Sequence, residues 1–166
     1  MPKMSKPEVV DSCGNGEAAV VRFTAGHLEA VLEIERNSFP DPWTVQMFRD
    51  ELQEDDRRIC LVLEDQSQVA GYLIGWVVLD EFHLGNLAVR LKSRGRGMGR
   101  ILLKKGLELA CQRGCRLATL EVRAGNQPAI ELYRSFGFRP VAIRKKYYHD
   151  EDALVMLADL DRGGQC

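Results

Sequence analysis

The fold is decided by the stretch LAVRLKSRGRGMGR at residues 87–100, where an apolar, strand-like run gives way to a helix. Three glycines alternate with other residues at this junction. From Met98 onwards, Leu103, Leu107 and Ala110 recur at spacings of four and three, which predicts a helix. The glycines therefore lie at a helix N-terminus, where unpaired N–H groups and a partial positive charge favour an anion.

The residues around these glycines carry a strong positive charge. Residues 90–105 contain seven Lys or Arg and no Asp or Glu. We interpret residues 94–100 as a diphosphate-binding loop and call them the glycine loop. A Walker loop is excluded because Gly-Lys-Ser/Thr is absent, and the alternation G-x-G-x-G does not match the dinucleotide fingerprint G-x-G-x-x-G. A solvated basic turn that caps an ordinary helix is the alternative.

Length and composition indicate one ordinary globular domain. The chain has 166 residues and a formal net charge of -1, so no general affinity for nucleic acid is expected. The charge is nevertheless uneven, because residues 29–65 hold eleven acids against four bases. An acidic region and a basic loop on one domain would suit a cationic partner and an anionic cofactor. No apolar window reaches about 18 residues, so no membrane span is expected.

Cysteine and histidine usage predicts neither a disulfide framework nor a metal site. The five cysteines are an odd number without a scaffold spacing, and the three histidines are scattered. The N-terminus also lacks the apolar core of a signal peptide. We therefore expect reduced thiols and a cytoplasmic protein that binds no metal.

Taken in order, the patterns predict a mixed α/β domain at residues 20–161, with flexible tails at 1–19 and 162–166. Prolines and glycines break any periodicity in the first tail. The predicted strands are 20–23, 59–64, 69–79, 81–89, 117–122, 138–148 and 153–160. The predicted helices follow Thr24, Thr44, the glycine loop and Asn126. A hairpin and a βαβ crossover then favour one mixed sheet with helices on both faces.

A second polar cluster follows the helix of the glycine loop. Glu121 is an acid within the apolar strand at 117–122, and Tyr133 lies on the apolar face of the next helix. In parallel βαβ units, ligands bind at the carboxyl ends of the strands. We therefore expect Glu121 to face the same crevice as the end of the strand at 81–89.

These motifs resemble a known family. Residues 94–99 fit Arg/Gln-x-x-Gly-x-Gly/Ala, which is similar to the acetyl-CoA loop of the GNAT acetyltransferases. The runs EVRAGN at 121–126, AIELY at 129–133, GF at 137–138 and RKKYY at 144–148 resemble the bacterial RimI-type enzymes. The resemblance covers residues 20–160. The first nineteen residues have no counterpart in the family, and Gly125 occupies a position where the family commonly has Ser.

The resemblance implies a GNAT-like fold, a mostly antiparallel sheet with a central, splayed parallel pair. It implies transfer of acetyl from acetyl-CoA, without a metal, to the N-terminal alanine of a small-subunit ribosomal protein by direct attack. Glu121 would then be the general base and Tyr133 the general acid. The implied cofactor-binding residues are Leu87, Ala88, Val89, Arg94, Gly95, Arg96, Gly97, Met98, Gly99, Arg100 and Asn126.

Each assignment has a structural alternative. Glu121 could be an acid paired with Arg123 or Arg144, Tyr133 could be plain core, and Asn126 could be a helix cap alone. Asp80 and Glu81 are further candidates for an alternative base or amine ligand. Trp43, Tyr147 and Tyr148 are candidates for the aromatic lining of a peptide groove. The alternative functions are acetylation of a small amine or a lysine side chain, and a non-catalytic module that binds acyl-CoA or RNA.

Overall fold

The computed structural model describes residues 9–13 and 18–161, and these divide into two compact units. The first unit contains the described residues up to Ile74 together with Asn86–Lys105. The second contains Gly75–Gly85 and the described residues from Gly106 onwards. Strands β4 and β5 and helix α3 each pass from one unit into the other.

The secondary structure follows the predicted order. The strands are β1 (Val9–Cys13), β2 (Ala18–Arg22), β3 (Arg58–Asp65), β4 (Gln68–Val78), β5 (Glu81–Val89), β6 (Leu117–Arg123), β7 (Arg139–Arg144) and β8 (Ala153–Asp159). The α-helices are α1 (Leu28–Ser38), α2 (Val45–Glu51), α3 (Met98–Gln112) and α4 (Gln127–Ser135). Two short 3₁₀ helices are η1 (Ala25–His27) and η2 (Leu91–Ser93).

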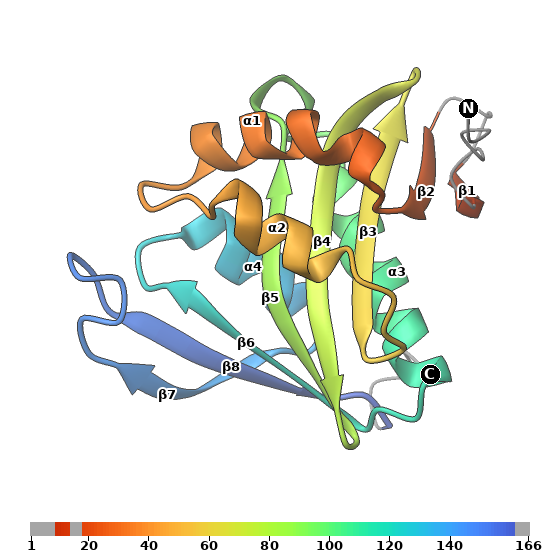
Figure 1. Ribbon diagram of the computed structural model, residues 1–166. Coiled ribbons are helices and arrows are strands. Elements are labelled where there is room, and N and C mark those ends of the chain that lie inside the picture. Colours follow the sequence, from red (N-terminus) through yellow and green to blue (C-terminus); the bar gives the residue numbers. More distant parts are fainter. Residues whose placement is uncertain (1–8, 14–17, 162–166) are drawn as a thin grey trace. The chain divides into compact units, whose positions relative to one another are not determined.

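In the first unit, helices pack on both faces of the strands (Figure 1). The strands lie in the order β1, β2, β3, β4, β5, with β1–β2 and β2–β3 antiparallel. Successive residues of a strand point to opposite faces. On one face, a Cβ added at Gly71 of β4 would lie 3.0 Å from Leu102 Cδ1 of α3. On the other, the ring of Tyr72 packs edge-on against Phe48 of α2.

The second unit holds the parallel pair of strands. Its strand order is β4, β5, β6, β8, β7, and β6–β8 and β7–β8 are antiparallel. β5 and β6 run parallel and pair from Glu81–Leu117 to Leu84–Leu120, so the last three residues of β6 have no partner on β5. The predicted fold class, a mostly antiparallel sheet with one parallel pair that separates, is confirmed.

Local capping explains where two helices begin. The Thr44 hydroxyl accepts a hydrogen bond from Met47 N at 3.2 Å, which starts α2. Asn126 Oδ1 accepts one from Ala129 N at 3.3 Å, and Pro128 lies in the first turn of α4. Both predicted caps are confirmed. At the third predicted cap, Thr24, the chain first forms η1 and enters α1 only at Leu28.

Two predicted elements need correction. Part of the segment predicted as a flexible tail forms β1, because its backbone pairs with β2 and needs no apolar periodicity to do so. The strand predicted to run to Tyr148 ends at Arg144. Lys146 has a positive φ of 49°, and its N–H donates to Asp152 Oδ1 at 2.8 Å, so the chain turns there. The remaining residues of the two predicted tails lie outside the described residues.

The prediction that every thiol is reduced is wrong for Cys111, which is disulfide-bonded. Cys60 and Cys115 are free, and burial raises the pKa of the Cys115 thiol. Cys111 lies in the last turn of α3, which ends at Gln112.

Candidate functional site

The glycine loop follows β5 in the first unit. Gly95 and Gly97 have positive φ values of 75° and 79°, a region that favours glycine. Arg94 fixes the start of the loop, because its side chain donates to Val89 O at 2.9 Å and to Ser38 Oγ at 3.0 Å. A Cβ added at Gly95 or Gly97 would meet no atom within 4 Å, so the missing side chains leave the backbone open to a ligand.

The loop delivers the chain into the N-terminus of α3, as predicted. The helix begins at Met98, and Ile101 N donates to Gly97 O at 3.1 Å. The first N–H groups of an α-helix have no acceptor within the helix and point outwards along its axis. The two open glycine positions, Gly95 and Gly97, lie beside such N–H groups and provide the chemistry that a diphosphate requires. The assignment of residues 87–89 and 94–100 to cofactor binding stays a prediction.

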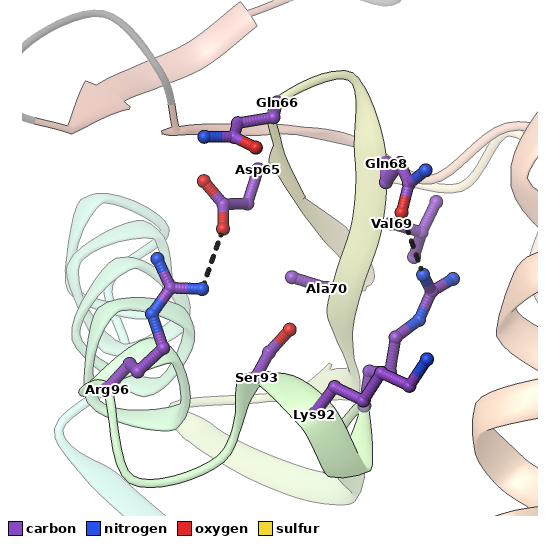
Figure 2. Close-up of a pocket in the computed structure, with 9 residues that line it drawn as sticks. Asp65, Gln66, Gln68, Val69, Ala70, Lys92, Ser93 and Arg96 are labelled. Carbon is purple, nitrogen blue, oxygen red and sulfur yellow. Dashed lines mark hydrogen bonds and ion pairs between the residues drawn. The ribbon is translucent and has the colours of Figure 1, made fainter.

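A pocket of about 270 Å³ lies beside the glycine loop in the first unit. Its lining combines the β3–β4 turn with the chain after β5: Asp65, Gln66, Gln68, Val69, Ala70, Arg90, Lys92, Ser93 and Arg96. Figure 2 shows Arg96 reaching towards Asp65, and their NH1 and Oδ2 atoms are 3.1 Å apart. Arg90 NH1 likewise donates to Gln68 Oε1 at 3.2 Å. These contacts tie the glycine loop to the β3–β4 turn.

Replacement of Gly97 by alanine tests the role of the loop. An alanine forced to a φ of 79° costs about 1–2 kcal/mol, and its methyl group would occupy the space left for a ligand. We expect acetyl-CoA to bind at least tenfold more weakly, as measured by isothermal titration calorimetry. Gly26→Ala is the matched control, because its Cβ would make only an ordinary 3.7 Å contact with Thr24 Oγ1. Equal affinity in both variants would show that the loop does not bind the ligand.

In the second unit, Glu121 lies on the less buried face of β6, where residues alternate between buried and half-buried. Its side chain is only 12% exposed. Oε2 lies 3.0 Å from His83 Nε2, and Oε1 lies 3.5 Å from Arg144 NH2. Of the two arginines considered from the sequence, Arg144 is therefore the partner. Arg123 instead pairs with Asp150 at 2.9 Å.

Tyr133 is a buried residue of α4, with 7% of its surface exposed. Its ring packs edge-on against Phe138 at a centroid distance of 5.9 Å. Burial raises the pKa of the Tyr133 phenol, so the group keeps its proton at neutral pH. Tyr133 is part of the hydrophobic core, which agrees with the structural alternative considered from the sequence. Its phenol also has the protonation state that a general acid requires.

Two residues near Glu121 were not assigned catalytic roles from the sequence. His83 donates or accepts at both ring nitrogens, towards Glu121 and towards Thr119 Oγ1 at 3.2 Å. Burial raises the pKa of Tyr148 to about 12, and the neighbouring Tyr147 and Glu121 charges act in the same direction. The parallel pairing of β5 and β6 could have suggested His83, because it lies opposite Thr119, and Glu121 follows Thr119 two residues later on β6.

The remaining candidates have structural roles in the described residues. Asn126 caps α4, and the N–H of the neighbouring Gly125 donates to Glu151 Oε1. Asp80 is exposed at a strand end, and its carbonyl oxygen accepts from Arg116 N at 2.7 Å. Within the described residues, no group of three or more His, Cys, Asp or Glu side chains is arranged to hold a metal ion.

Comparison with known proteins defines the class. The sequence model of the acetyltransferase (GNAT) family matches residues 28–138. The chain therefore belongs to the GNAT acetyltransferase family, and the predicted enzyme class is confirmed. None of the helices in residues 9–13 and 18–161 has the length and hydropathy of a membrane span.

Within this family the chain is similar to RimI-type enzymes, as the motifs indicated. It is 38% identical over 133 residues to the [ribosomal protein bS18]-alanine N-acetyltransferase of Salmonella typhimurium, covering 78% of this chain and 88% of that protein. A Bacillus subtilis relative is 40% identical over 142 residues, covering 84% of this chain and 94% of the relative. The crystal structure of the ribosomal-protein-S18-alanine N-acetyltransferase from Escherichia coli superposes with a TM-score of 0.79 at 34% identity, covering 86% of this chain and 93% of that one.

Proposed function

We propose that this protein transfers the acetyl group of acetyl-CoA to the α-amino group of the N-terminal alanine of ribosomal protein bS18. The observation that carries the proposal is the 38% identity to the Salmonella enzyme of that name over 133 residues. We further propose that the protein acts in the cytoplasm, without a metal.

The glycine loop fits the cosubstrate. Acetyl-CoA carries a diphosphate, and the loop combines a helix N-terminus, two glycines with positive φ and a wholly basic sequence. We assign diphosphate binding to the backbone around Gly95, Gly97 and Gly99, with Leu87–Val89 as further ligands of the cosubstrate. The cosubstrate supplies the activated acetyl group as a thioester.

Glu121 fits the role of the general base. An N-terminal α-amino group is largely protonated at neutral pH, because its ordinary pKa is about 8. Its nitrogen must lose a proton before it can attack a thioester. The carboxylate of Glu121 accepts that proton at the oxygen that does not face His83, directly or through a water. Direct attack requires no acyl-enzyme, so no cysteine acts as a nucleophile.

Tyr133 fits the role of the general acid. The departing CoA thiolate takes up a proton, and the Tyr133 phenol retains one at neutral pH because burial raises its pKa. Tyr148 is the second phenol of this unit with a raised pKa. Comparison of Tyr133→Phe with Tyr148→Phe assigns the proton donor, since only loss of the donor lowers kcat while peptide affinity is kept.

The function is tested with the full chain, acetyl-CoA and three peptides. One begins with the alanine and following residues of bS18, the second is the same peptide with a blocked N-terminus, and the third offers only a lysine amine. We expect thiol release with the first peptide alone. Acetylation of the lysine peptide alone would establish the alternative enzymatic function. Binding of acetyl-CoA without turnover of any peptide would establish a non-catalytic module.

A further inference from the structure

His83 belongs to a hydrogen-bonded chain that ends on Glu121. Its Nε2 lies 3.0 Å from Glu121 Oε2, and its Nδ1 lies 3.2 Å from Thr119 Oγ1. The indole of Trp76 flanks the ring at a centroid distance of 5.9 Å. All four residues belong to the second unit. The imidazole is thus held on two sides and by a neighbouring ring, while 37% of its side chain stays exposed to solvent.

We propose that His83 is the positioning residue of the general base, and that its Nε2–H holds the Glu121 carboxylate in the orientation in which it accepts the proton of the substrate. This inference rests on the proposed function, in which Glu121 removes the proton of the α-ammonium group. It assigns a role to His83 that differs from that of Glu121, because His83 acts through the carboxylate and never on the substrate.

The hydrogen-bond pattern decides the resting tautomer. A carboxylate oxygen can only accept, so Nε2 carries the proton and donates it to Glu121 Oε2. In the neutral imidazole, Nδ1 then accepts from the Thr119 hydroxyl. Both ring nitrogens are therefore used, and the ring cannot turn without losing its contact with Thr119 or with Glu121.

The carboxylate of Glu121 is contacted at both oxygens. His83 Nε2 lies 3.0 Å from Oε2, and Arg144 NH2 on β7 lies 3.5 Å from Oε1. The Arg144 contact is longer and its side chain is 55% exposed, so the shorter contact with His83 fixes the carboxylate more closely. On β5 itself the next residue of the same face is Glu81, which is exposed.

The protons balance without His83. In each turnover the α-ammonium nitrogen loses two protons: one passes through Glu121 to solvent, and the other balances the proton that the departing CoA thiolate takes up. His83 takes no part in this transfer.

Two substitutions separate the donated hydrogen bond from packing. His83→Gln keeps an N–H donor, and His83→Phe removes the donor and keeps an aromatic ring beside Trp76. For each variant, kcat is measured at saturating acetyl-CoA and peptide, and KM is measured for the peptide. Loss of packing alone would affect both variants alike, whereas rescue by glutamine identifies the hydrogen bond.

We expect the kcat of His83→Gln to be at least fivefold higher than that of His83→Phe, with the KM for the peptide changed by less than about twofold in both. Equal kcat values for the two variants would overturn the orienting role. If His83→Phe does not fold, His83→Ala takes its place in the comparison.

Failure of this inference is distinct from failure of the proposed function. If the wild type acetylates the alanine peptide and the two variants have equal kcat values, only the role of His83 is lost. If the wild type acetylates only the lysine amine, the substrate assignment is lost, and the same comparison of the two variants with that amine still tests His83.

Discussion

Glu121→Gln is expected to lower kcat by about 100-fold or more, because general-base catalysis ordinarily contributes about 10²–10⁴ to the rate. The substitution keeps the shape of the side chain, and its amide oxygen still accepts from His83 Nε2, which lies 3.0 Å from Oε2 in the wild type. The amide cannot take up the proton of the ammonium. The rate is followed by release of free CoA thiol with the alanine peptide at neutral pH.

Acetyl-CoA binding separates this effect from a damaged fold. The diphosphate is proposed to bind to the backbone of the glycine loop, which Glu121→Gln does not change, so acetyl-CoA affinity should stay within about twofold of the wild type. Glu131→Gln, an exposed change on α4, is the matched control and should keep the wild-type rate. An unchanged kcat in Glu121→Gln near pH 7 would place the base elsewhere in the protein.

Local sequence patterns predicted those features whose causes are local. The glycine loop could be located because an alternation of glycines with basic residues at a strand end leaves few structural options. Thr44 and Asn126 could be identified as caps because a cap bonds an N–H only three residues ahead. The positive φ at Gly97 also has a local cause, since glycine adopts it without steric cost.

Long-range contacts could not be predicted in the same way. The histidines were read as scattered, because His83 and Thr119 are 36 positions apart and meet only through the parallel register of β5 and β6. The guanidinium of Arg96 in the glycine loop pairs with Asp65, 31 positions earlier, and no local pattern indicates that contact. The acidic region at residues 29–65 was treated as one charged surface, yet Glu35 within it is only 1% exposed.

Glu35 gives the second large effect. Its carboxylate accepts from Trp43 N at 2.8 Å, from Asn86 Nδ2 at 3.0 Å and from the Tyr72 hydroxyl. These donors come from the loop after α1, from β5 and from β4, all in the first unit. Burial, with the Glu35 charge beside it, raises the pKa of the Tyr72 phenol far above its ordinary value, so the phenol stays a donor. One buried carboxylate thus joins three segments.

We expect Glu35→Ala to lower the free energy of unfolding by about 3–5 kcal/mol, because each buried donor left without an acceptor costs about 1–3 kcal/mol. For a chain of this size the loss corresponds to a fall in Tm of about 10 °C, measured by thermal unfolding. Glu33→Ala is the control on the same helix. Its side chain is exposed, and its effect should stay within about 0.5 kcal/mol.

Glu35→Gln shows whether the acceptors or the volume of the side chain matter. The amide fills the same space, but its NH₂ group faces one of the donors that the second carboxylate oxygen satisfied. We therefore expect a loss of stability between those of Glu33→Ala and Glu35→Ala, and a raised KM for the peptide, since Glu35 holds the backbone at Trp43 in the loop proposed to line the peptide groove. A Tm equal to that of the wild type in Glu35→Gln would mean that packing alone, and not the three hydrogen bonds, fixes this part of the first unit.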